Sequence, residues 1–412
     1  MTEAPARWRA LDAFRGLAVI GMLLVNNPGD HDAVYAQLEH SAWNGCTIAD
    51  LVFPFFLFVV GITTAITLER VASDSDAAIR RRIWRRAAVI FGIGLLLNWF
   101  PFYQSGPISW TDHPGLLDRV AARLLVLRIP GVMQRIGVVY LFTAVIAQRA
   151  SVRTIVVITL SLLIGYWILL TLVPVPGEGV IRAAVMNEPS RTIVAHVDRT
   201  LFDWSRWGLG NHLWDNALTW DPEGTLSTLP AIATGLLGVI LRSAATKDPS
   251  AAEENIGSPR RTGVLLSLRS LRMTVALIAL GWIWSYWFPL NKSLWTSSFA
   301  LYTAGIGGLL LLGLTYALER NPNATWVRPL IVFGENPLIA YAGSELARRV
   351  LHSSIKINTS TGRLGTDEWV FRQFETVGLS PKAASLAWTV LFLAAWWMLL
   401  ARLSQRRLFV RV

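Results

Sequence analysis

The chain has 412 residues, of which 53% are hydrophobic and only 16% are charged, and its mean hydropathy is +0.44. Ordinary globular chains carry about 25% charged residues, so a water-soluble fold could not hide this much apolar surface. The net charge of +11 would suit nucleic acid, but the Lys and Arg residues cluster in short loops between apolar segments. We therefore expect no nucleic-acid partner and a lipid bilayer as the surroundings.

Ten apolar segments approach the roughly 20 residues that a helix needs to cross a bilayer. In chain order they are 11–27, 47–69, 83–102, 131–149, 152–174, 225–242, 271–290, 294–318, 327–350 and 383–403. We predict an all-α fold, a polytopic integral membrane helical bundle of about ten transmembrane helices. Residues 1–412 are expected to form a single transmembrane domain.

The distribution of basic residues predicts the orientation. More than half of the 38 Lys and Arg residues fall in the segments 1–10, 70–86, 149–153, 242–272, 319–328 and 402–412. Loop 28–46 has none, and the positive-inside rule therefore puts the basic segments and both termini in the cytoplasm. The same rule predicts a cytoplasmic linker at 243–270 and extracytoplasmic loops at 28–46, 103–130, 175–224 and 351–382.

The densest polar signal lies around the expected start of the second span. His40, Trp43, Asn44 and Asp50 gather there, and Asn26 ends the first span on the same side. An ionisable group at a span marks a functional candidate, and a histidine suits general base work. Structural interpretations stay open: Asp50 as a carboxylate at a helix N-terminus, His40 as an interfacial histidine, and Asn26 as a helix stop before Pro and Gly.

Two carboxylates precede the sixth span on the outer side. Asp221 and Glu223 lie in the segment 221–228. Together they could hold a cationic acceptor such as an amine. The structural alternative is a capped helix start, with acidic residues near the positive end of the helix.

Several polar side chains could meet an anionic cofactor. Arg15 lies three residues after Asp12, which also suits a structural ion pair. Arg86 ends the basic run 80–86, and the positive-inside rule alone would explain why these basic residues are there. Gln134 and Arg135 start the fourth span, where they line a cavity or extend to the interface. No zinc-ligand spacing or phosphate-binding loop is present, so we expect no metal.

The motifs together resemble the heparan-α-glucosaminide N-acetyltransferase family and its bacterial relatives. The block HSAWNGCTIADLVFPFFLF (40–58) is the most specific part. The others, in family order, are ALDAFRG (10–16), VNNPG (25–29), RIPGVMQRIGVVY (128–140), DPEGTLST (221–228), PLNKSLW (289–295) and FGENPLIAY (333–341).

This resemblance implies an acyltransferase that takes the acetyl group of cytoplasmic acetyl-CoA, its co-substrate, to the amine of an amino sugar on the extracytoplasmic side. His40 matches the family's active histidine, and Asn26 its asparagine at the outer end of the first span. We expect His40, Asn26 and Asp50 to be catalytic. Acceptor binding is expected from Asp221, Glu223, Trp43 and Asn44, and coenzyme binding from Arg15, Arg86, Gln134 and Arg135.

Other functions stay open on the sequence alone. An O-acyltransferase of envelope glycans would differ only in the acceptor atom. A solute transporter would share the polar breaks in its helices. The sequence lacks the large luminal segment that animal members carry before the first span, so we expect a smaller amino sugar or a glycan as acceptor. A bacterial inner membrane location is expected, and neither a homodimer nor an acetyl-histidine intermediate is decided.

Overall fold

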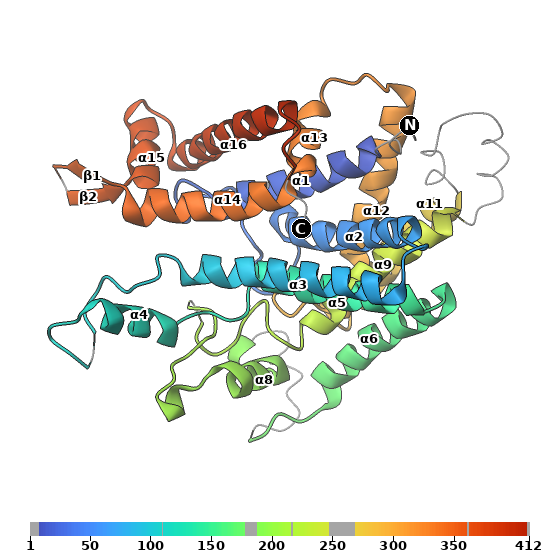
Figure 1. Ribbon diagram of the computed structural model, residues 1–412, viewed down its shortest axis with the longest axis horizontal. Coiled ribbons are helices and arrows are strands. Elements are labelled where there is room, and N and C mark those ends of the chain that lie inside the picture. Colours follow the sequence, from blue (N-terminus) through green and yellow to red (C-terminus); the bar gives the residue numbers. More distant parts are fainter. Residues whose placement is uncertain are drawn as a thin grey trace.

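The computed structural model describes residues 8–108, 110–177, 188–215, 217–246, 268–360 and 362–409. It is mostly helical, as expected (Figure 1). The central part of the predicted linker 243–270, and residues 178–187 of the predicted loop 175–224, lie outside the described residues.

Long helices cover nine of the ten predicted spans. They are α1 (Arg9–Asn26), α2 (Ile48–Arg70), α3 (Asp76–Trp99), α5 (Val132–Arg149), α6 (Val152–Leu172), α9 (Thr228–Thr246), α11 (Leu268–Trp284), α12 (Ser297–Arg320) and α16 (Pro381–Gln405). The remaining span, 327–350, is two helices, α13 (Arg328–Glu335) and α14 (Pro337–Arg349). They break at Asn336, because the following proline has no N–H to continue the helical hydrogen bonds.

The predicted outer loops contain short elements of their own. Figure 1 shows α4, the hairpin and α15 at one end of the bundle. The antiparallel hairpin pairs β1 with β2 and is the one sheet within the described residues. The short elements are α4 (Leu116–Leu125), η1 (Pro189–Arg191), α8 (Ile193–Phe202), η2 (Ser205–Trp207), η4 (Val350–Ser354), β1 (Lys356–Thr359), β2 (Gly362–Gly365) and α15 (Thr366–Thr376).

Five of the described helices are long and apolar enough to cross a membrane: α2, α6, α9, α12 and α16. Charge keeps others from this group, since α1 carries Arg9, Asp12 and Arg15, and α3 begins with the arginines of 80–86. The count of about ten spans therefore stays a prediction.

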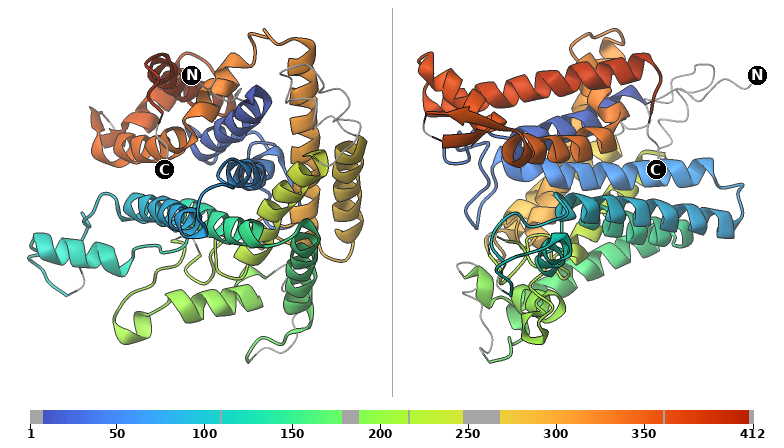
Figure 2. Two further views of the ribbon diagram at one scale, coloured as in Figure 1. Left: turned by 45° about the vertical axis from the view of Figure 1, so that its right-hand side comes forward. Right: turned by 60° about the vertical axis from the view of Figure 1, so that its left-hand side comes forward.

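Helix α2 lies at the centre of the bundle. It packs against α1, α5, α9 and α12, and Figure 2 shows it nearly end-on with other helices around it. Leu57, Phe58 and Ile62 of α2 are completely buried in the main apolar core. By contrast, α6 and α16 bury only about a third of their apolar stretch, which leaves apolar faces that suit contact with lipid.

The two ends of α2 mark two ends of the bundle. Asp50 begins the helix and Glu69 ends it, 19 residues later, or about 29 Å along the axis. At the far end, Glu69 pairs with Arg242 of α9 at 2.9 Å, and Gln148 of α5 donates to Asp76 of α3 at 3.4 Å. The basic segments around residues 70–86, 149 and 242 thus share the end of the bundle away from Asp50.

Both ends of the described chain meet α13. The side chain of Arg15 in α1 donates to the carbonyl oxygen of Gly334 at 3.1 Å. Near the end of α16, Ser404 donates to Glu335, and the carbonyl oxygen of Leu408 accepts from Asn336 at 3.3 Å. The two termini therefore lie on the same side, while the compartment that they face stays a prediction.

Glycines allow α2 and α9 to approach closely. A methyl group added at Gly61 would lie 1.8 Å from the carbonyl oxygen of Gly235. Small residues at such crossings let helix backbones touch, which is a main source of packing energy in membrane bundles.

We predict that Gly61→Ala destabilises the protein by about 1–3 kcal/mol, because the added methyl group forces the two helices apart. Thermal unfolding in detergent measures this as a lower melting temperature. Gly313→Ala in α12 is the matched control, since nothing lies within 4 Å of its added methyl group. A Gly61→Ala protein as stable as the control would contradict the prediction.

We also predict that the two ends of the bundle face opposite compartments. In a Cys46→Ser background, Ala36→Cys and Ser73→Cys place one thiol at an exposed position of each end. In intact cells, an impermeant maleimide should label residue 36, and it should label residue 73 only after permeabilisation. Both variants should react in detergent, and labelling of both from the same side would refute the orientation.

Candidate active site

The side chain of Asp50 joins the start of α2 to His40. Asp50 is completely buried, and its Oδ1 lies 2.8 Å from His40 Nδ1. Its Oδ2 accepts hydrogen bonds from the Thr47 backbone N–H at 3.0 Å, the Thr47 hydroxyl at 3.1 Å and the Ser41 backbone N–H at 3.2 Å. Thr47 and Asp50 form a capping box, a local signal for a helix start. Asp50 therefore both caps α2 and orients His40.

Lys292 contacts the other face of the imidazole. Its Nζ lies 2.9 Å from His40 Nε2 and 3.3 Å from Nδ1. Because Nδ1 donates its hydrogen to the Asp50 carboxylate, Nε2 carries the lone pair. The ammonium is close to both ring nitrogens, so it does not lie in line with that lone pair. The three side chains make a continuous Asp50–His40–Lys292 chain of polar contacts.

Asparagines connect the His40 loop to the loop of Lys292. Asn291 Nδ2 donates to Asn44 Oδ1 at 3.2 Å, and Asn291 Oδ1 accepts from the Leu294 backbone N–H at 2.8 Å. Next to Asn44, the ring of Trp43 meets that of Trp220 edge to face, with centroids 5.4 Å apart. Trp43 and Asn44 thus lie in the wall of the site, and their contact with an acceptor stays a prediction.

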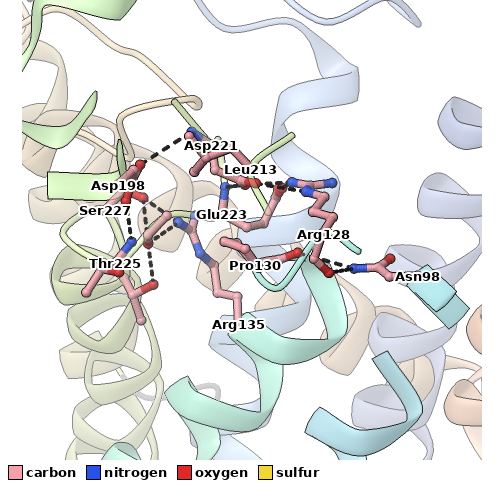
Figure 3. A network of polar contacts seen from close by, with 12 residues as sticks. Asn98, Arg128, Pro130, Arg135, Asp198, Leu213, Asp221, Glu223, Thr225 and Ser227 are labelled. Atoms are coloured by element: carbon pink, nitrogen blue, oxygen red, sulfur yellow. Dashed lines mark hydrogen bonds and ion pairs between the residues drawn. The ribbon is translucent and has the colours of Figure 1, made fainter. Parts of the chain in front are cut away.

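A buried ion network lies close by (Figure 3). Arg128 donates to both carboxylate oxygens of Asp221, at 2.8 and 2.6 Å, and to Glu223 at 2.5 Å. Although burial opposes it, the two carboxylates raise the pKa of Arg128. Burial alone would raise the pKa of the Glu223 carboxyl, but the charges of Arg128 and Arg135 lower it. The pair proposed from the sequence to hold an amine thus already holds an arginine.

The first turn of α5 brings buried hydrogen-bond donors to the same region. Arg135 is 2% exposed, and its Nη2 donates to the carbonyl oxygen of Gly224 at 3.1 Å and to the hydroxyl of Ser227. Among the described residues, Arg135 Nε and Nη1 and the amide nitrogen of Gln134 have no hydrogen-bond partner. A carbonyl or phosphoryl oxygen would satisfy such donors, which makes Gln134 and Arg135 fit a coenzyme group.

Asp198 of α8 holds the loop that carries Asp221 and Glu223. It is completely buried and accepts the backbone N–H groups of Thr225 at 3.0 Å and Asp221 at 3.3 Å. A methyl group on Gly224 would lie 2.1 Å from an Asp198 oxygen, so only glycine fits this approach. Burial raises the pKa of Asp198 to about 7.

Three other sequence candidates have recorded contacts with residues other than His40. Arg15 contacts Asp12 at 3.0 Å, which is the structural ion pair considered from the sequence. The guanidinium of Arg86 lies over the ring of Tyr140, 4.8 Å from its centroid. Asn26 donates to Glu345 of α14 at 3.3 Å. The described coenzyme candidates thus do not form one cluster, and only Gln134 and Arg135 lie at the His40 end.

Four helices begin around this site. Asp50 lies in the first turn of α2 and Arg135 in that of α5, while Ser227 and Lys292 precede α9 and α12. Helix N-termini carry partial positive charge, so the arrangement favours an anionic group or a negative charge that develops during a reaction. Within the described residues, no cluster of three or more His, Cys, Asp or Glu side chains could hold a metal ion.

Comparisons with known proteins agree with the resemblance seen in the sequence. The family model described as "Heparan-alpha-glucosaminide N-acetyltransferase, catalytic" matches residues 7–176. The human protein of that name is 28% identical over 383 residues, 84% of this chain, and the mouse protein is 28% identical over 382 residues, 82% of it. The chain is therefore similar to members of this family. It spans about half the length of these relatives, 54% and 53%.

The family match includes Asn26, His40, Asp50 and the first turn of α5. It does not reach the partners that the fold brings in from later in the chain. No sequence pattern singled out Arg128 or Asp198, and Lys292 was included only as part of the motif PLNKSLW (289–295). The signal available for Lys292 was a lone lysine in the short loop between α11 and α12, on the side of the bundle with fewer basic residues.

We predict that Asp198 makes stability depend on pH. Its carboxyl binds a proton more tightly in the folded protein than in the unfolded chain, where it titrates near 3.8. Stability should therefore fall as pH rises from about 4 to 7 and level off above that range. Asp198→Asn resembles the protonated form, so its melting temperature should fall less than that of the wild type between pH 5 and 8.

Asp112→Asn is the control for this comparison, because Asp112 is exposed and its replacement should leave the wild-type pH dependence unchanged. Parallel melting curves for wild type and Asp198→Asn across this pH range would contradict the prediction.

Proposed function

We propose that this chain is a membrane N-acetyltransferase that moves the acetyl group of acetyl-CoA to the amine of an amino sugar. The main observation behind this proposal is the contact between the buried Asp50 carboxylate and His40 Nδ1. It leaves the lone pair of Nε2 available as a base. The name of the human and mouse relatives describes an enzyme of this reaction type. A base and an activated acyl group are the chemical needs of such a transfer.

His40 acts as the base in this proposal. Its Nε2 takes a proton from the acceptor's ammonium, which leaves a free amine able to attack an acyl carbon. Asp50 stabilises the imidazolium that forms, because its carboxylate contacts Nδ1 at 2.8 Å. Acetyl-CoA supplies the activated thioester carbonyl. Direct transfer and an acetyl-histidine intermediate remain alternatives, which a burst of CoA release without acceptor would separate.

The coenzyme approaches from the basic end of the bundle in this proposal. Arg86 lies ten residues into α3, about 15 Å from its start, and contacts Tyr140 of α5. Gln134 and Arg135, with unsatisfied buried donors, lie farther along α5 toward His40. These side chains follow the α3–α5 contact from the basic end to the site, whereas Arg15 contacts α13 instead. The path thus favours Arg86, Gln134 and Arg135 for the coenzyme.

The acceptor binds at the opposite end, beside His40 and Trp43. Asp221 is fully buried and paired with Arg128, so its role is to fix Arg128 and the loop before α9. Glu223 is the carboxylate that also faces Lys292 and Arg135 electrostatically. Three further predictions belong to the same proposal. Asn26 donates a hydrogen bond to the acyl oxygen, the protein lies in the inner membrane of a bacterium, and it forms a homodimer.

We predict that His40→Ala lowers acetyl transfer by roughly 10²- to 10⁴-fold, the usual contribution of a positioned general base. Radiolabelled acetyl transfer from acetyl-CoA to glucosamine measures it in purified protein. Asp50→Asn should also lower the rate, although loss of its helix cap would lower stability too.

His113→Ala is the matched control, because His113 is exposed and lies in the loop before α4. Full activity of His40→Ala would remove His40 from the mechanism. A wild type that binds no acetyl-CoA would favour a transporter, and a product labile to mild alkali would show O-acylation.

A further inference from the structure

We infer that Lys292 is a further catalytic residue of this acyl transfer, whose ammonium stabilises the negative charge that develops on the acyl oxygen. The inference rests on the proposed function, because it needs His40 Nε2 to be the atom that receives the acceptor's proton.

The position of Lys292 supports this role. Its Nζ lies 2.9 Å from His40 Nε2, and the attacking nitrogen must come within hydrogen-bond distance of the same Nε2, about 2.7–3.2 Å. The acyl oxygen is bonded to the carbon under attack, so it lies within reach of a lysine beside Nε2. Because Lys292 has a long and flexible stem, its ammonium can donate to that oxygen while the acceptor occupies Nε2.

The backbone of Lys292 is fixed independently of its side chain. The neighbouring Asn291 is completely buried, and its backbone N–H donates to the hydroxyl of Thr296 at 3.1 Å. The same asparagine binds Asn44 in the loop of His40. Two loops that are far apart in sequence therefore hold the ammonium and the imidazole in register.

Charged groups of both signs surround Lys292. Burial lowers the pKa of Lys292, while the carboxylates of Glu223 and Asp50 work in the opposite direction and Arg135 adds to the lowering. Within the described residues, the recorded hydrogen bonds of Nζ go to His40. Asp50 directs its oxygens to His40, Thr47 and Ser41 instead. A half-buried ammonium of this kind interacts strongly with a new anionic oxygen.

The step balances with Lys292 protonated throughout. The acceptor's ammonium gives one proton to His40 Nε2, and its nitrogen then forms the C–N bond with the acyl carbon. As that bond forms, the acyl oxygen gains negative charge and accepts a hydrogen bond from Lys292. When the C–S bond breaks, the sulfur leaves with the second proton of the nitrogen, and His40 returns its proton to solvent.

The test compares Lys292→Met with Lys292→Arg. Methionine keeps the length and most of the volume but removes the charge, so kcat should fall by roughly 100-fold, as for loss of one donor to an oxyanion. Acetyl-CoA binding, measured by titration calorimetry, and the melting temperature should stay at wild-type values. Arginine keeps a cation and should restore part of kcat, which a purely structural lysine would not require.

Lys382→Met in the exposed first turn of α16 is the matched control and should behave as wild type. Wild-type kcat in Lys292→Met would overturn the inference, as would equal losses of kcat in the methionine and arginine variants. A wild type that transfers no acetyl group to any amine would instead refute the proposed function.

Discussion

The site depends on the buried carboxylate of Asp50. One oxygen contacts His40, and the other caps α2 by accepting from Thr47 and Ser41. A buried carboxylate without partners is very costly, so these contacts form together or not at all. His40 is therefore placed by the same interaction that starts the central helix of the bundle.

Buried side chains of both charges lie close to Asp50 and His40. Arg128, Arg135 and Lys292 face Asp221 and Glu223 where α5, α9 and α12 begin. Removing Arg128, which contacts both carboxylates directly, would leave uncompensated buried charge, which commonly costs several kcal/mol. Strong mutual pairing also explains why so many ionisable groups can lie beside apolar helices. The cluster specifies how the starts of these helices meet.

The sequence predicted local features well and long-range ones poorly. Apolar length located the helices, although Pro337 divides the ninth predicted span at Asn336. The sequence analysis named both His40 and Asp50 as catalytic, and the structure brings these two residues, only ten apart in the chain, into contact. The pairing of Arg128 with Asp221 joins residues 93 apart, and that of Lys292 with His40 joins residues 252 apart. Nothing in the local sequence pattern reveals such partners, so Asp221 and Glu223 were assigned to a cationic acceptor and not to Arg128.

The separation between the basic end and His40 limits how the reaction can be arranged. About 29 Å of α2 lies between Asp50 and Glu69, so no side chain at the basic end can touch a group bound at His40. A small acyl donor bound at His40 would make no contact with the arginines at the basic end. A long donor, anionic at one end and acylated at the other, could contact both Arg86 and Arg135 on the way to Nε2. Under the proposed function, acetyl-CoA is a donor of this kind, because it is long, anionic at one end and acylated at the other.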